Sequence, residues 1–121
     1  MIYTSYFGNH KHFPKSAIVL GITRFPPAWW TGINIDKLAP SEQLLRQYRN
    51  KEIDEYIFTM EYQQELRDRG LTQEKVKDFF ETLGGDKDII LCCYEKTGEF
   101  CHRHVFADWM AKVLTITELE S

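Results

Sequence analysis

Two runs of almost uninterrupted apolar residues do most to limit the folds open to this chain. They are residues 17–23 (AIVLGIT) and 88–94 (DIILCCY). Strands that are covered on both faces, as in a parallel sheet, typically show such runs. Helical patterns lie between them, and strands that alternate with helices indicate an α/β layered fold. We therefore expect a mostly parallel central sheet flanked by helices (Rossmann-like), in which the two runs are neighbouring central strands.

Three helices are predicted between the two runs. One is capped by Ser41, one extends from about Asp54 to Arg69 and ends at Gly70, and one is capped by Thr72. Apolar residues at helical spacing predict which side of each helix faces the core. The residues expected on those sides are Leu44, Leu45, Tyr48, Ile57, Met60, Leu66, Val76, Phe79, Phe80 and Leu83.

The remaining segments are shorter. Residues 2–7 predict a first strand, and residues 24–32 predict a loop, because its two adjacent prolines each remove a backbone donor. That loop carries Trp29 and Trp30. Residues 114–121 suit either an edge strand or a tail. No stretch rich in Gly, Ser or Pro divides the chain, so we expect one domain over residues 1–121.

Charge and composition bear on partners and location. The chain has 18 acidic and 15 basic residues, a formal net charge of −3 and no run of Lys or Arg, so we expect no binding of duplex nucleic acid. No apolar run approaches the ~20 residues of a membrane span, and the first residues do not resemble a signal peptide. We therefore expect a cytoplasmic protein that does not bind membranes, with its three cysteines reduced. Nothing in the sequence identifies a cofactor or an oligomeric state.

The candidate site is the strand, loop and helix over residues 89–113. The last helix is expected to begin at about Cys101, and helical spacing places His102 on its buried face with Cys101 and Arg103 on the flanks. Glu95 leaves the preceding strand beside this helix start. In parallel sheets, ligands bind beyond the carboxyl ends of the strands, and a helix start stabilises an anion or a thiolate there.

This segment resembles the signature of the family known as domain of unknown function 488, whose members are bacterial and phage-encoded. The matching residues are Leu91, Cys92, Glu95, Lys96, Cys101, His102 and Arg103, and Cys93-Tyr94 stands where many members have a single residue. The rest of the chain is similar to the family in its order of elements. Arg24 matches the arginine of the family's Asp-x-Arg, but the Asp is missing. The resemblance implies the fold and the position of a site, and no particular reaction.

The leading hypothesis is a pocket for a small anionic ligand, either a nucleotide or a phosphorylated metabolite. Arg103 would hold the anion together with the helix start, because a guanidinium presents a fork of donors that matches phosphate. Arg24, at the carboxyl end of the second strand, would converge on it, with Tyr94 and Lys96 as further ligand-binding residues. The competing structural interpretation pairs either arginine with a carboxylate, most obviously that of Glu95.

A first alternative is an enzyme with Cys101 as its nucleophile. A helix start beside His102 and Arg103 lowers the pKa of a thiol and so favours the reactive thiolate. Glu95 would orient the imidazole or act as a general acid or base. The catalytic residues would then be Cys101, His102 and Glu95, and the sequence leaves open whether the chain is an enzyme at all.

Two further functions are compatible with the sequence, an interaction surface and a metal site. An exposed patch at Trp29 and Trp30 would make the chain a non-enzymatic interaction module. A metal site would have to combine Cys92 or Cys93 with Cys101 and His102, but the spacing has no Cys-x-x-Cys pair and no His-x-x-x-His face. From spacing alone we therefore predict no metal site.

Overall fold

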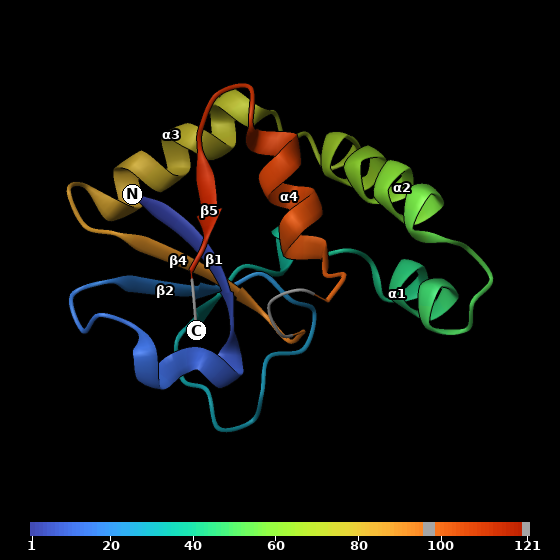
Figure 1. The fold of residues 1–121 in the computed structure, drawn as a ribbon. Helices are drawn as coiled ribbons and strands as arrows, with labels where there is room; N and C mark the ends of the chain where they lie inside the picture. Colours follow the sequence, from blue (N-terminus) through green and yellow to red (C-terminus); the bar gives the residue numbers. More distant parts are fainter. Residues whose placement is uncertain (96–98, 120–121) are drawn as a thin grey trace.

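One all-parallel sheet organises the chain, as Figure 1 shows. The computed structural model describes residues 1–95 and 99–119. Within them, the five strands run in the order β3-β2-β4-β1-β5, which confirms the expected α/β fold. The strands are β1 (Ile2–Tyr6), β2 (Ile18–Gly21), β3 (Ile33–Asn34), β4 (Ile89–Cys93) and β5 (Ile116–Glu118).

The two apolar runs form the adjacent strands β2 and β4, as predicted. Leu20 pairs with Leu91, and all five residues of β4 are buried. Alternate residues of a strand point to opposite faces of its sheet. Leu91 accordingly belongs to one core and Cys92 to the other. Both faces of the central strand are therefore covered, which explains its continuous apolar sequence.

The first core lies between the sheet and four helices, which gather on one side of it in Figure 1. They are α1 (Glu42–Arg49), α2 (Glu55–Asp68), α3 (Gln73–Gly84) and α4 (His102–Met110). The side chains of Ser41 and Thr72 accept a backbone N–H at the starts of α1 and α3, as predicted, and that of Asp54 does the same at the start of α2. Gly70, at φ 79°, follows α2 in the left-handed conformation that glycine adopts without cost.

The second core is smaller and lies on the opposite face of the sheet. It is covered by a 3-10 helix, η1 (Phe7–His12), and by the predicted aromatic loop. The rings of Phe7 and Trp30 meet edge to face, with centroids 5.1 Å apart. A second 3-10 helix, η2 (Asp36–Leu38), connects β3 to α1. The α-helices therefore flank mainly one face.

Three residues predicted to face inward are exposed. Ile57 and Met60 on α2 are 39% and 51% exposed, and Phe79 on α3 is 46% exposed. The buried side of α2 is instead the i, i+4, i+8 stripe of Phe58, Tyr62 and Leu66. Tyr62 belongs in this stripe because its hydroxyl donates to the Leu38 carbonyl, which satisfies its polar end.

The end of the chain resolves the choice between strand and tail. Ile116–Glu118 forms the edge strand β5, which pairs in parallel with β1. The helix α4 ends at Met110, three residues before the predicted end. None of the helices in the described ranges is long and apolar enough to cross a membrane.

Candidate functional site

The start of α4 lies at the carboxyl ends of β2 and β4, as the sequence predicted. His102 contacts Ile22 just after β2, and Cys101 contacts Cys93 at the end of β4. Cys101 is the N-cap residue, and His102 opens the helix. Cys101 and His102 are 3% and 6% exposed, and Arg103 is fully buried. The chemically distinctive motif is therefore enclosed by protein.

His102 is held in one orientation and one tautomer. Its Nε2 lies 2.6 Å from the Ile22 carbonyl oxygen, which can only accept, so Nε2 carries the proton. The ring of Tyr62 meets it edge to face, with centroids 5.9 Å apart. Burial lowers the pKa of His102 to about 4, although the bond to Ile22 opposes this shift. The neutral ring directs its unprotonated Nδ1 to Cys101 Sγ, 3.9 Å away.

The cysteines differ from the three reduced thiols that we expected. Cys93 and Cys101 are joined by a disulfide, and Cys92 is a buried free thiol. The alternation of β4 explains the choice of partner, because it turns Cys93 toward α4 and Cys92 toward the second core. Burial raises the pKa of Cys92 to about 12.

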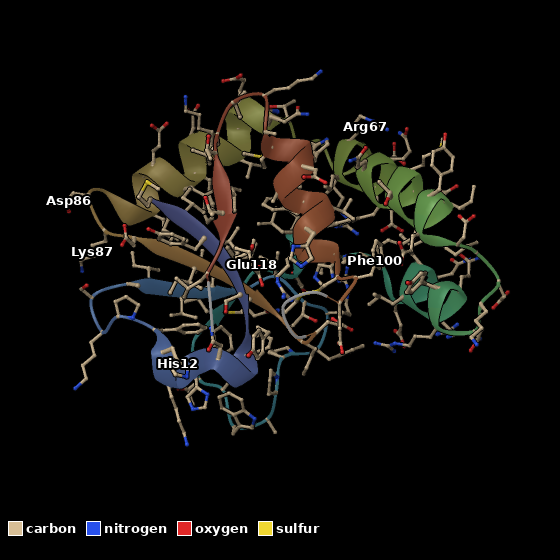
Figure 2. The ribbon with its side chains drawn as sticks, viewed as in Figure 1. His12, Arg67, Asp86, Lys87, Phe100 and Glu118 are labelled. Atoms are coloured by element: carbon tan, nitrogen blue, oxygen red, sulfur yellow. A yellow bond between two sulfur atoms is a disulfide. The ribbon has the colours of Figure 1, made fainter. Side chains whose placement is uncertain are left out.

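Arg103 is occupied by protein partners. Its Nε and NH2 donate to the two carboxylate oxygens of Glu118 at 3.0 and 2.8 Å, the bidentate geometry of a strong ion pair. Its NH1 donates to the Glu95 carbonyl at 2.6 Å and to Cys93 Sγ at 3.1 Å. Glu118, labelled in Figure 2, is the last residue of the edge strand β5. The carboxylate partner is therefore Glu118, and Glu95 contributes its backbone only.

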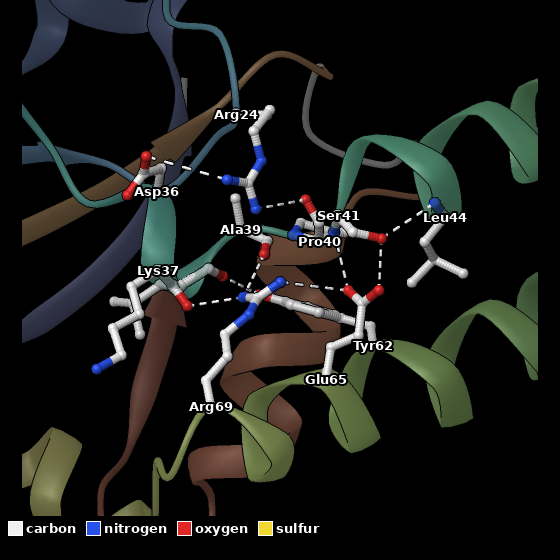
Figure 3. Close-up of polar contacts among 11 residues, drawn as sticks. Arg24, Asp36, Lys37, Ala39, Pro40, Ser41, Leu44, Tyr62, Glu65 and Arg69 are labelled. Carbon is white, nitrogen blue, oxygen red and sulfur yellow. Dashed lines mark hydrogen bonds and ion pairs between the residues drawn. The ribbon is translucent and has the colours of Figure 1, made fainter.

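Arg24 belongs to a different network, drawn in Figure 3. Its NH2 donates to the Pro40 carbonyl at 3.3 Å, and its NH1 lies 3.9 Å from the Asp36 carboxylate. Beside it, Glu65 accepts from both the backbone and the hydroxyl of Ser41. These contacts fix the segment that leads into α1. The contacts that the structure gives for Arg24 and Arg103 thus share no partner.

The Glu95 side chain lines the rim of an open cavity of about 600 Å³. The other lining residues are Leu45, Tyr48, Arg49, Lys51, Glu52, Ile53 and Asp54. The cavity thus lies between the carboxyl end of β4 and the turn that joins α1 to α2. Phe100, labelled in Figure 2, packs against the lining residue Tyr48, with ring centroids 5.2 Å apart.

Two carboxylates act on the Tyr48 hydroxyl: Glu95, which lines the cavity, and Glu55, which does not. Burial, followed by the charges of Glu55 and Glu95, raises the pKa of the Tyr48 hydroxyl. The hydroxyl therefore keeps its proton at neutral pH and can donate a hydrogen bond. Arg49 and Lys51 supply positive charge to the same cavity.

The other predicted ligand-binding residues are placed differently. Tyr94 is 48% exposed, and its hydroxyl donates to the Phe25 carbonyl at the aromatic loop. Lys96 lies outside the described residues. Trp29 is 56% exposed, whereas Trp30 is partly buried against Phe7, so the two indoles do not form one exposed patch.

Sequence reasoning missed Glu118, Arg49 and Lys51. A carboxylate in a short strand of Ile and Thr was the available signal for Glu118, since such a charge needs a partner when its strand joins a sheet. No motif marks Arg49 and Lys51. They resemble any basic residues at the end of a helix.

Comparison with known proteins assigns the family alone. The family described as "DUF488-N3a: Active DUF488-N3 subclade" matches residues 8–114. No curated protein and no solved structure matches the chain.

Proposed function

Because the chain belongs to the DUF488-N3a family, the active DUF488-N3 subclade, we propose that it is an enzyme acting on a nucleotide or a phosphorylated metabolite bound in the Glu95 cavity. One observation carries the proposal. A carboxylate at the carboxyl end of a central parallel strand shares a cavity with two cations and a phenol. Ligands of open α/β sheets bind at this end of the strands.

Arg49 and Lys51 would hold the phosphate. Arg103 cannot take this role without giving up its pair with Glu118, whereas Arg49 and Lys51 are exposed at the cavity. A guanidinium and an ammonium together suit a phosphate, the first through its fork of donors and the second as a point charge.

The carboxylates suit the rest of such a ligand. Glu52, Asp54 and Glu95 also line the cavity, so its three carboxylates and two cations carry a formal charge of −1. This balance disfavours a bare anion and favours a molecule with a phosphate at one end and hydroxyl donors, such as those of a sugar, at the other. Leu45, Ile53 and the Tyr48 ring offer apolar surface for a base or ring.

Glu95 would transfer the proton. It lies in the loop two residues beyond the end of β4 and so approaches the cavity from the carboxyl end of the sheet. A carboxylate within hydrogen-bond reach of the ligand acts as general base or acid.

The backbone of Lys51 also points to a functional role. At φ 60° it is the non-glycine residue with a positive φ in the described chain. A side chain in this conformation costs about 1–2 kcal/mol, and such residues cluster at functional sites. The ammonium at the cavity is a physical reason for a lysine at a position that glycine would fill more comfortably.

Titration calorimetry with AMP and ribose 5-phosphate tests the proposal. We expect the wild type to bind at least one of them, and Arg49→Gln combined with Lys51→Gln to weaken binding more than about tenfold, because each charged hydrogen bond contributes about 1.5–3 kcal/mol. Arg46→Gln, on the same helix but outside the cavity lining, is the matched control and should bind normally. Unchanged affinity in the double variant, or no binding of either probe, would overturn the proposal.

The two alternatives have less support in the geometry. A nucleophilic Cys101 requires a free thiol that meets a substrate, whereas Cys101 is buried and disulfide-bonded. An interaction surface at the aromatic loop would rest on Trp29 without Trp30.

A further inference from the structure

Three buried side chains that the cavity does not use meet at the start of α4. They are Cys93, Cys101 and His102, whose two Sγ atoms and one imidazole nitrogen all lie within 4.8 Å of one another. β4 supplies Cys93 and the helix start supplies the other two. From this geometry we infer that the reduced chain binds one Zn²⁺ ion through Cys93 Sγ, Cys101 Sγ and His102 Nδ1. The inference is independent of the Glu95 cavity.

The spacing of the donor atoms suits zinc. Bonds of about 2.3 Å to sulfur and about 2.0–2.1 Å to nitrogen place the S and N ligands of a tetrahedral ion about 3.6 Å apart. Cys101 Sγ and His102 Nδ1 are 3.9 Å apart. The Cα atoms of Cys93 and Cys101 are 7.4 Å apart, beyond the range of about 4.4–6.8 Å that is usual for a disulfide. The backbone is thus spaced for two thiolates with an ion between them.

The surroundings are those of a metal ligand set. A zinc-bound histidine usually donates its other N–H to a carbonyl or carboxylate, which fixes the tautomer. His102 does this through Nε2 to the Ile22 carbonyl at 2.6 Å, and so leaves the Nδ1 lone pair available to an ion. Arg103 NH1 donates to Cys93 Sγ at 3.1 Å, a contact that stabilises a thiolate.

Charge balance favours a divalent ion in this enclosed place. Two thiolates and a neutral imidazole carry a charge of −2, which Zn²⁺ cancels. A buried site with no net charge avoids most of the desolvation cost of an isolated ion. The fourth tetrahedral position would belong to water or to an exogenous donor. The spacing along the sequence had argued against a metal site, but the fold brings distant ligands together.

The disulfide and the zinc site are two states of the same cysteines. A thiol or phosphine reductant supplies two electrons, the S–S bond breaks, and two protons yield two thiols. Zn²⁺ then displaces both thiol protons and binds the thiolates. Because the ligands are buried, the ion would enter as the reduced chain folds.

The experiment refolds the full chain with Zn²⁺ in a phosphine reductant, removes free metal and measures bound zinc. We expect one ion per chain after reduction and none in the disulfide form. Cys101→Ser and Cys93→Ser should each weaken binding more than about 100-fold, since the loss of an outer-shell partner alone typically costs 10–100-fold. Cys92→Ser is the control, because Cys92 lies in the other core and should leave zinc binding unchanged.

A second measurement uses the wild type, in case the serine variants do not fold. Zn²⁺ should protect Cys93 and Cys101 from alkylation while Cys92 reacts equally with and without the ion. The inference is overturned if the reduced chain retains no zinc, if a folded Cys101→Ser variant retains it fully, or if zinc protects neither cysteine.

Discussion

The start of α4 and the Glu95 cavity lie at the same end of the sheet but differ in what they expose. At the helix start, His102 and Arg103 are buried and bound to Ile22 and Glu118. At the cavity, Arg49 at the end of α1 and Lys51 in the turn that follows are exposed. His102 and Arg103 therefore hold α4 to the sheet, while Arg49 and Lys51 are open to solvent. Reactive residue types identify a region of the fold, and exposure decides which of them can meet a small-molecule ligand from solution.

The largest loss of stability is expected at Arg103. Arg103→Ala should destabilise the chain by about 3–5 kcal/mol, because it leaves the largely buried Glu118 carboxylate without its bidentate partner. A pair of thermal melts measures this, with an expected fall in Tm on the order of 10 °C. Arg46→Ala breaks an exposed pair with Glu42 and should cost less than about 1 kcal/mol. Similar losses in the two variants would contradict the contrast.

A smaller effect is expected at His102 as the pH falls. The pKa of His102 is lowered from 6.5 to about 4 in the folded chain, so between these values the unfolded chain binds more protons. Stability should therefore be full above about pH 6.5 and fall by up to about 3 kcal/mol as the pH drops toward 4. Melts across this range should show a shallower slope in His102→Gln than in the wild type. The exposed His12→Gln variant is the control and should keep the wild-type slope.

The smallest effect is a gain in stability, and it is expected at Lys51 in the cavity. Lys51→Gly should raise stability by up to about 1 kcal/mol, because glycine adopts a positive φ without the cost borne by lysine. The same variant should bind AMP more weakly, since it removes an ammonium from the cavity. Lys51→Ala should weaken binding without the gain in Tm. A Lys51→Gly variant that lost stability would contradict the proposal that the positive φ of Lys51 costs stability and is kept for ligand binding.

The sequence predicted the parts of the fold that depend on local pattern. The apolar runs located β2 and β4, the caps at Ser41 and Thr72 located two helix starts, and a helical pattern from about Asp54 located the third. It failed where tertiary contacts decide. On α2, Tyr62 is buried because a distant carbonyl accepts its hydroxyl, and no local pattern contains that partner.

The site shows the same division. The position of the motif and the burial of His102 followed from helical spacing. The burial of Arg103 did not, because it depends on Glu118 in an edge strand that the sequence left undecided. The cavity was likewise hidden, since two helices and a strand end must be assembled before it exists.

The pairing of β1 with β5 also determines when the chain can fold during synthesis. Thr4 donates to Glu118 at 2.6 Å across a sequence separation of 114 residues, and Glu118 is also the counterion of Arg103. A nascent chain that has reached residue 110 already contains Arg103 but not its carboxylate. Until β5 emerges from the ribosome, α4 cannot dock without burying an unpaired guanidinium. Contacts of such long range also make folding slow. The growing polypeptide should therefore keep α4 undocked, and within reach of chaperones, until a strand of three residues has been made.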